Sequence, residues 1–308
     1  MGAAITAFVT DPDGIVGAEL VATLVARGND VLALASSSDG AARIRRAGAI
    51  AVAGNLATPG RWQDEVAADW VFHLPPPVDD RRSGPARAAD ASARVSIDRH
   101  VFDAVAAGTT RRLVYVASLA RYRAATTTPI TENELPAPCA GERRDISPLD
   151  CLEGYVLAGL PIVTGIPGCV YGSSGWFRDL IAAPVMAGRR IPLWRPADHC
   201  VTPIHVHDCA RALVHLAERG VIGRRYFVAN SEPVRLDELA ATFARVANRP
   251  LRTWPFPGIT RFLTDRHPMP CGPLDTVFSN LRLRRTGFEF EYPTVEHGCR
   301  QILRTFHD

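Results

Sequence analysis

Lysine is absent from this sequence, whose 35 basic residues are all arginines. No catalytic step can therefore use a lysine amine, either as a nucleophile or as the cation that lowers the pKa of a neighbouring hydroxyl. An arginine at such a position stays charged and is a poor proton shuttle. Base composition in a GC-rich genome explains the bias without a functional cause, but the chemical restriction holds in either case.

Other absences limit the class of protein. No apolar run approaches the length of a membrane span, and the first nine residues lack the charged start and apolar middle of a signal peptide, so we expect a soluble, cytoplasmic protein. The 7 cysteines form no C-x-x-C pair, and their odd number favours reduced thiols over a disulfide framework. The net charge of +3 comes without a basic tail, which argues against a nucleic-acid partner.

The residues from Ile5 to Gly28 organise the rest of the chain. A short apolar run ends in a turn that contains Gly14 and Gly17, and apolar residues then recur at helical spacing up to Gly28, where a C-cap glycine belongs. Strand, tight turn and helix in this order predict the first βα unit of a dinucleotide-binding sheet, whose helix N-terminus can hold a pyrophosphate. Packing of the helix on the sheet can also require both glycines, so this alternative stays open.

Apolar runs of strand length and helical patterns alternate along the rest of the chain. Strands are predicted at 31–35, 49–56, 70–74, 112–118, 161–172 and 226–230. Helices are predicted at about 91–107, 176–190 and 236–248, and the polar segment 79–91 is predicted to be a loop. The alternation predicts an α/β fold with a doubly wound parallel sheet.

Several motifs resemble those of the extended short-chain dehydrogenases, also called NAD-dependent epimerase/dehydratases. Thr10, Gly14 and Gly17 stand as in the family's Thr-Gly-x-x-Gly-x-x-Gly turn, with Asp11 in place of its first glycine. Further segments that resemble the family are 70–74, 112–118, 161–172, 202–212 and 279–288. The resemblance implies a Rossmann-type dinucleotide-binding-like domain (1–172 and 201–230) with a smaller C-terminal substrate lobe (173–200 and 231–308). It also implies a homodimer packed through helices at about 91–107 and 147–158.

Two departures from the family bear on the cofactor. Asp11 and Asp13 place carboxylates where a pyrophosphate would bind, a repulsion of roughly 1–3 kcal/mol. The prolines at 75–77 remove N–H donors from backbone that passes close to the cofactor in the family. We therefore predict either no cofactor or weakly bound NAD(P). The residues predicted to line this cofactor site are Thr10, Gly14, Ile15, Gly17, Ser36, Asn55 and Leu74.

The family's catalytic Tyr-x-x-x-Lys pair is also missing. In the family the tyrosine acts as acid and base, and the lysine lowers its pKa. Alignment places the tyrosine position at Arg144 or Asp145 and the lysine position at Pro148 or Leu149. We therefore expect hydride transfer by the usual route to be disabled or very slow.

Other residues can carry acid/base chemistry at the same end of the sheet. The resemblance places Ser118 on the family's catalytic serine, and an Asp145 base with an arginine beside it would suit enolisation, dehydration or ring closure. The predicted catalytic residues are Ser118, Asp145, Tyr122 and Arg144, and the predicted substrate-binding residues are Pro75, Arg121, Pro167, Tyr171 and Arg178. Instead of a catalytic role, Ser118 can cap local backbone groups, and the charged residues can be solvated surface residues. His205 and His207 share a strand face, but their spacing matches no ligand motif, so no metal is predicted.

Three functions follow in order of preference. The first is an atypical epimerase/dehydratase-family enzyme that carries out non-redox isomerisation, dehydration or cyclisation of a small oxygenated metabolite in bacterial biosynthesis. The second is an NAD(P)-dependent reductase or epimerase with relocated catalytic groups. The third is a non-catalytic ligand-binding or regulatory protein.

Overall fold

A computed structural model describes residues 5–76, 84–119, 126–134, 148–192, 200–254 and 276–306. The chain forms two compact units. Unit 1 comprises Met1–Ser118, Pro138–Ile166 and Ala210–Tyr226, and unit 2 comprises Leu119–Ala137, Pro167–Cys209 and Phe227–Asp308. Each unit is described separately below.

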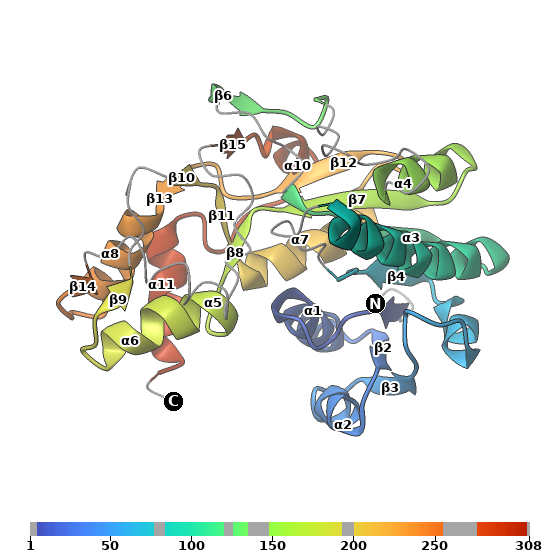
Figure 1. Cartoon of the computed structure of the whole chain (residues 1–308), viewed down its shortest axis with the longest axis horizontal. Helices are drawn as coiled ribbons and strands as arrows, with labels where there is room; N and C mark the ends of the chain where they lie inside the picture. Colours follow the sequence, from blue (N-terminus) through green and yellow to red (C-terminus); the bar gives the residue numbers. More distant parts are fainter. Residues whose placement is uncertain are drawn as a thin grey trace. The chain divides into compact units, whose positions relative to one another are not determined.

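A seven-stranded sheet forms the centre of unit 1, in the order β12-β7-β5-β4-β1-β2-β3 (Figure 1). Its strands are β1 (Thr6–Val9), β2 (Asp30–Ala35), β3 (Ile50–Ala53), β4 (Trp70–His73), β5 (Arg112–Val116), β7 (Ile162–Pro167) and β12 (Arg225–Val228). Neighbouring strands from β3 across to β7 pair in parallel. Strand order reverses between β1 and β4, which is where doubly wound sheets bind ligands. The predicted Rossmann-type α/β fold is confirmed.

Apolar side chains on both faces of this sheet explain why helices cover it. The last three residues of β1 and of β4 are buried, as are Leu113 and Val114 of β5. The elements of unit 1 that connect the strands are α1 (Ile15–Ala26), α2 (Ser38–Arg46), η1 (Arg61–Val66), α3 (Gly84–Ala107) and α4 (Pro148–Leu157), followed by α7 (Val206–Arg219), which begins in unit 2. Helices α3 and α4 lie side by side (Figure 1).

Local sequence explains where the first two helices begin and end. Gly14 is the N-cap of α1, and Gly28 follows the helix with φ of 77°, a conformation that glycine adopts without strain. Ser37 caps α2, because its hydroxyl accepts a hydrogen bond from the Gly40 N–H at 3.1 Å. Both helices therefore start directly beyond the carboxyl end of a strand, where a ligand site is expected.

Two predicted elements differ from the structure. Helix α3 begins at Gly84, before the predicted start at about 91, so part of the polar segment 79–91 is helical. The predicted strand 161–172 is two strands, because β7 ends at Pro167 and β8 (Cys169–Tyr171) pairs instead with β11 (Pro203–His205). At the break, a Cβ on Gly168 would stand 2.3 Å from the Thr202 carbonyl oxygen, so this close backbone approach requires glycine.

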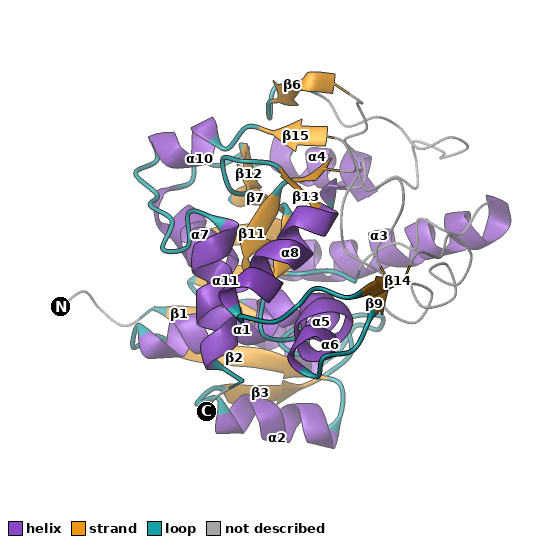
Figure 2. Ribbon diagram, turned by 90° about the vertical axis from the view of Figure 1, so that its left-hand side faces the viewer, coloured by secondary structure: helices purple, strands orange, loops and turns teal. Residues whose placement is uncertain are grey.

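Unit 2 has its own core. Its elements are β6 (Thr126–Ile130), β8, α5 (Gly175–Phe177), the π-helix η4 (Arg178–Ala182), α6 (Ala183–Met186), β9 (Ile191–Pro192), β10 (Cys200–Val201), β11, β13 (Val234–Arg235), α8 (Leu236–Val246), β14 (Thr253–Trp254), β15 (Thr276–Phe278), α10 (Leu281–Arg285) and α11 (Val295–Arg304). Helices α8 and α11 pack side by side (Figure 2). Buried residues between them include Phe243 and Ile302.

Candidate functional site

A pocket of about 240 Å³ opens in unit 1 beyond the carboxyl ends of the first strands. Its lining comes from the loops after β1, β2, β3 and β4 and from α3. The residues are Thr10, Asp11, Pro12, Asp13, Leu34, Ser36, Gly54, Asn55, Leu56, Ala57, Pro76 and Ile97. Ser36 and Asn55 contribute uncharged polar groups, whereas among the described residues the only charged side chains in this lining are the carboxylates of Asp11 and Asp13. The pocket therefore lies where a dinucleotide is expected but carries negative charge at one end.

Thr10 connects the end of β1 to the end of β4. Its hydroxyl accepts a hydrogen bond from the Leu74 N–H at 3.0 Å and lies 3.1 Å from Nδ1 of His73. Nε2 of His73 lies 2.9 Å from Oδ1 of Asp98, so Nε2 carries the ring proton and Nδ1 accepts from Thr10. Thr10, His73 and Asp98 are all buried, which fixes these two strand ends relative to each other.

A charged pair on α3 continues this buried network. Nε of Arg94 donates to both carboxylate oxygens of Asp98, at 3.0 and 3.2 Å. The Tyr115 hydroxyl lies between them, accepting from Arg94 at 2.8 Å and donating to Asp98 at 3.0 Å. The guanidinium of Arg94 is 8 % exposed and the Asp98 carboxylate is fully buried, so each compensates the charge of the other.

Arg94 also holds a wall of the pocket. Its NH1 donates to the Pro76 carbonyl oxygen at 2.6 Å, and Pro76 lines the pocket. Prolines provide no N–H donor, so this backbone can be anchored only through its carbonyl groups. The predicted loss of N–H donors in this segment is thus matched by a buried donor that reaches it from α3.

Asp11 occupies the start of α1. Its Oδ2 lies 2.8 Å from where a Cβ on Gly14 would stand, so the carboxylate lies against the N-cap of this helix. Burial raises the pKa of this carboxyl, with a further contribution from the nearby charge of Asp13. The chain's own carboxylate thus lies at the helix start, where a phosphate would otherwise bind.

Asp13 points to a different partner. Arg43 of α2 donates to Oδ1 of Asp13 from Nε at 3.1 Å and from NH2 at 2.7 Å. A two-pronged guanidinium–carboxylate contact of this kind neutralises the charge of Asp13. The two carboxylates of the turn are therefore not equivalent, because Asp11 lies against the N-cap of α1 and Asp13 faces a cation.

The two glycines of the turn are packed to different extents. A Cβ on Gly17 would lie 1.7 Å from the Asp11 carbonyl oxygen, so backbone packing requires glycine there without any ligand. A Cβ on Gly14 would meet only the end of the Asp11 side chain, 2.8 Å from its Oδ2. Thr10, Ser36 and Asn55 line the pocket, whereas Gly14, Ile15 and Gly17 lie at the start of α1 and Leu74 follows β4. Cofactor contact by these seven residues stays a prediction.

The predicted catalytic and substrate-binding residues are only partly described. Tyr122, Asp145, Arg144 and Arg121 lie outside the described residues. Ser118 is exposed two residues after β5, and Pro75 is half-buried beyond β4. Pro167 ends β7 in unit 2, and Arg178 is mostly exposed with its NH1 3.9 Å from Oδ1 of Asp179. The roles of these residues stay predictions.

Tyr171, predicted to bind substrate, is fully buried in the core of unit 2. Its hydroxyl has no hydrogen-bond partner among the described residues and packs against Gly298, where a Cβ would lie 2.2 Å away. Burial raises its pKa well above the usual range. Within this unit the ring therefore packs as a core side chain.

None of the described tyrosines is prepared to act as a base. Burial raises the pKa of Tyr115 and Tyr155, as it does for Tyr171, and raises that of Tyr292 to about 12. The Tyr226 hydroxyl accepts a hydrogen bond from the Val221 N–H at 2.9 Å. A tyrosine that serves as a proton relay needs its pKa lowered toward the working pH, and the shifts found here are in the opposite direction.

Sequence reasoning did not find the network of Thr10, His73, Asp98, Arg94 and Tyr115. One signal was present in α3, where Arg94 and Asp98 stand four residues apart on the face that also buries Ala91, Val95 and Phe102. Charged residues in the apolar stripe of a helix indicate a buried pair. The contacts with β1, β4 and β5 depend on the tertiary fold.

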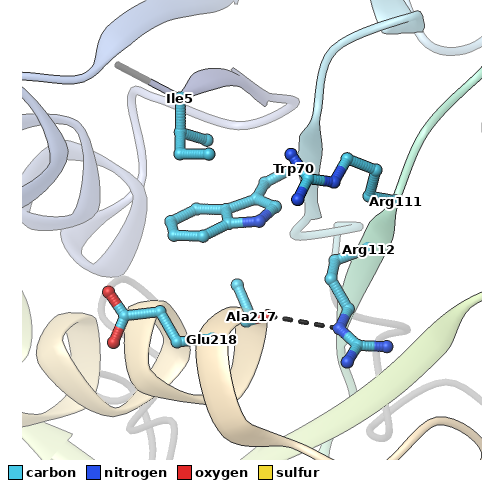
Figure 3. A pocket seen from close by; sticks show the side chains of 6 residues that line it. All are labelled: Ile5, Trp70, Arg111, Arg112, Ala217 and Glu218. Carbon is cyan, nitrogen blue, oxygen red and sulfur yellow. Dashed lines mark hydrogen bonds between the residues drawn. The ribbon is translucent and has the colours of Figure 1, made fainter. Parts of the chain in front are cut away.

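A second pocket of unit 1, of about 340 Å³, lies at the amino ends of β1, β4 and β5. Figure 3 shows the Trp70 indole between Ile5 on one side and Ala217 of α7 on the other. Two arginines in this lining are held by the protein itself: Arg111 lies 3.2 Å from Asp69, and Arg112 donates to the Ala217 carbonyl at 3.3 Å. Ligands of doubly wound sheets bind at the carboxyl ends of the strands, so the first pocket is the candidate site.

The described residues contain neither a membrane-spanning helix nor a group of metal ligands. No helix in these parts of the chain combines the length and the apolar character needed to cross a membrane. No group of three histidine, cysteine, aspartate or glutamate side chains there could hold a metal ion.

Comparison with known proteins agrees with the fold. The NAD dependent epimerase/dehydratase family matches residues 7–229. UDP-N-acetylglucosamine 4-epimerase from Bacillus cereus superposes with a TM-score of 0.78 at 16% identity, covering 99% of this chain and 100% of the other. UDP-glucuronic acid 4-epimerase from the same organism, in complex with UDP-glucuronic acid and NAD, gives 0.76 at 14% identity, covering 98% and 100%.

A dehydratase is similar to the same extent. dTDP-glucose 4,6-dehydratase from Bacillus anthracis, in complex with NAD, gives a TM-score of 0.75 at 14% identity and covers 99% of this chain and 97% of the other. No curated protein matches the sequence. Identities this low establish a shared fold and leave the reaction to be argued from the residues of this chain.

Proposed function

The chain belongs to the NAD-dependent epimerase/dehydratase family, and from this membership we propose an atypical enzyme that carries out non-redox acid/base chemistry. The proposed reaction is an isomerisation, dehydration or cyclisation of a small oxygenated metabolite in bacterial biosynthesis. The observation that carries the proposal is the complete absence of lysine, because no amine can lower the pKa of a tyrosine. The raised pKa values of the described tyrosines support it.

The start of α1 does not fit the cofactor that the family implies. Two of the similar structures hold NAD, but here the Asp11 carboxylate lies against the N-cap of α1, where a pyrophosphate would bind. We therefore propose that NAD(P) binds weakly or not at all, and we route no step of the reaction through a nicotinamide. We propose that the protein binds a small-molecule substrate and that it assembles as a homodimer.

We assign proton transfer to residues that follow β5 in the sequence. The Asp145 carboxylate would take a proton from a carbon next to a carbonyl group, and Arg144 would stabilise the negative charge that develops on the carbonyl oxygen. Ser118, which is exposed, would donate a hydrogen bond to the same oxygen. Tyr122 and the substrate-binding candidates Pro75, Arg121, Pro167, Tyr171 and Arg178 would complete the site.

Deuterium exchange tests this chemistry directly. Purified protein is incubated in D2O with a panel of hydroxycarbonyl metabolites and sugar nucleotides, and products are analysed by mass spectrometry while nicotinamide absorbance is followed. We expect deuterium to enter a substrate carbon with no change in nicotinamide absorbance. Ser118→Ala and Asp145→Asn should remove the exchange, whereas Asp150→Asn, an exposed carboxylate of α4, is the matched control and should keep it.

Two alternatives give different results in the same experiment. Turnover coupled to oxidation or reduction of a nicotinamide would instead show an NAD(P)-dependent reductase or epimerase with relocated catalytic groups, an alternative that the pocket beyond the first strands favours. Binding of a metabolite without any exchange would show a ligand-binding or regulatory protein. Release of small molecules on denaturation, followed by mass spectrometry, identifies what the purified protein retains.

A further inference from the structure

The carboxylate of Asp11 lies in the position that an anionic ligand would take. It follows Thr10 at the end of β1, lines the pocket, and has its Oδ2 2.8 Å from where a Cβ on Gly14 would stand. Gly14 is the N-cap of α1, so the carboxylate lies at a helix N-terminus, whose N–H groups attract anions. A diphosphate arriving here meets an occupied position and a like charge at close range.

Asp13 does not act in the same way, although it is only two residues away. Its Oδ1 is held by Arg43 at 2.7 and 3.1 Å, so its charge is matched within the turn. Negative charge near the pocket is therefore not sufficient to identify the residue that opposes a phosphate. Position distinguishes the two carboxylates.

The remaining lining suits a ligand without charge. Leu34, Leu56 and Ile97 provide apolar surface, and Ser36 and Asn55 provide uncharged polar groups. The volume of about 240 Å³ is below the roughly 300–1,000 Å³ typical of sites for drug-sized ligands, so this pocket has room for a nucleoside-sized ligand rather than for a dinucleotide.

We propose that Asp11 is a built-in anion that replaces the diphosphate, so that the unit 1 pocket selects an uncharged, nucleoside-sized ligand over a dinucleotide. This inference rests on the proposed function, from which we take that this pocket is a ligand site. The sequence agrees with this proposal, because Asp11 stands in place of the first glycine of the family's turn. A glycine there would leave the start of α1 open to a phosphate.

Two substitutions at one position separate charge from shape. Asp11→Asn removes the charge and keeps the size, and Asp11→Gly removes the side chain. Asp150→Asn is the matched control, because it changes the net charge by the same amount at an exposed position of α4 that does not line the pocket. Adenosine serves as a nucleoside without phosphate and NADH as the dinucleotide. Isothermal titration at neutral pH gives both dissociation constants for each protein, and far-UV circular dichroism confirms that each variant is folded.

We expect the wild type to bind adenosine more tightly than NADH. The ratio of the NADH to the adenosine dissociation constant should fall at least tenfold in Asp11→Asn and Asp11→Gly, about 1.4 kcal/mol. In Asp150→Asn it should fall less than threefold. Tighter binding of NADH than adenosine to the wild type, undetectable adenosine binding, an unchanged ratio in both Asp11 variants, or an equal change in Asp150→Asn would overturn the proposal. Deuterium exchange does not enter this measurement, so the proposed function can fail independently.

Discussion

Replacing Asp98 by asparagine should destabilise unit 1 strongly. The carboxylate of Asp98 is fully buried and accepts hydrogen bonds from His73, Arg94 and Tyr115 at 2.9 to 3.2 Å. Asp98→Asn keeps the shape but leaves the Arg94 guanidinium buried without a counter-charge, which costs about 3–5 kcal/mol when one partner of a buried pair is removed. We expect the free energy of unfolding to fall by about this amount.

The magnitude can be measured by urea denaturation at pH 7, followed by far-UV circular dichroism and by tryptophan fluorescence. Arg94→Met should be similarly destabilising, because it leaves the Asp98 carboxylate without its cation and the Pro76 carbonyl without its donor. In the double variant Arg94→Met/Asp98→Asn no uncompensated charge is left. Its loss should therefore be smaller than the sum of the single losses by about 0.5–3 kcal/mol.

A surface pair with the same spacing provides the control. Arg300 and Glu296 stand four residues apart on α11, as Arg94 and Asp98 do on α3, and their side chains are 64% and 35% exposed. Arg300→Gln should give no measurable loss, because solvent screens an exposed pair. A loss below about 1 kcal/mol for Asp98→Asn, or additive losses in the double variant, would refute the view that this network compensates a buried charge.

Three further predictions follow from described residues. Burial lowers the pKa of His73, so the unfolded chain takes up a proton near pH 6.5 while the folded ring stays neutral, and the free energy of unfolding should fall as the pH drops below that value. His73→Gln should flatten this pH dependence in urea titrations, and an unchanged slope would contradict the reasoning. Burial and the neighbouring Asp13, itself paired with Arg43, raise the pKa of Asp11, so NAD+ affinity should increase as the pH falls from 7 toward 5 in the wild type and stay constant in Asp11→Asn by isothermal titration. Gly17→Ala should destabilise the protein by about 1–3 kcal/mol in thermal or urea unfolding because its Cβ would overlap the Asp11 carbonyl, whereas Gly154→Ala, exposed on α4 with open space around it, should stabilise by about 0.5–1 kcal/mol.

Strands and helices could be predicted from the sequence because apolar periodicity reports burial directly. The strand that ends at His73 is apolar on both faces, which in a parallel sheet means helices on each side. The break after Pro167 was not predictable in this way, because β7 and β8 are both apolar and only the approach of Thr202 to Gly168 separates them. The start of α3 was missed because its first turns are polar and carry no apolar stripe.

The candidate site could be located, but its electrostatics could not. The turn after β1 identified the pocket, and Asp11 and Asp13 were visible as carboxylates within it. The sequence gives no direction for either side chain, so both were expected to repel a phosphate. Their different surroundings, the N-cap of α1 for one and Arg43 of α2 for the other, appear only when the turn after β1 is placed beside α2.

Composition alone established that no lysine can serve this protein, and the order of apolar runs established a doubly wound sheet, because both are properties of the chain itself. Tertiary structure decided which charges meet. Thr10, His73, Asp98 and Tyr115 come from four separate elements, and burial makes their contacts strong only after the sheet and α3 exclude water from between them. The separation of these residues along the chain does not indicate that water is excluded from between them, because the exclusion of water arises from the packing of the sheet and α3.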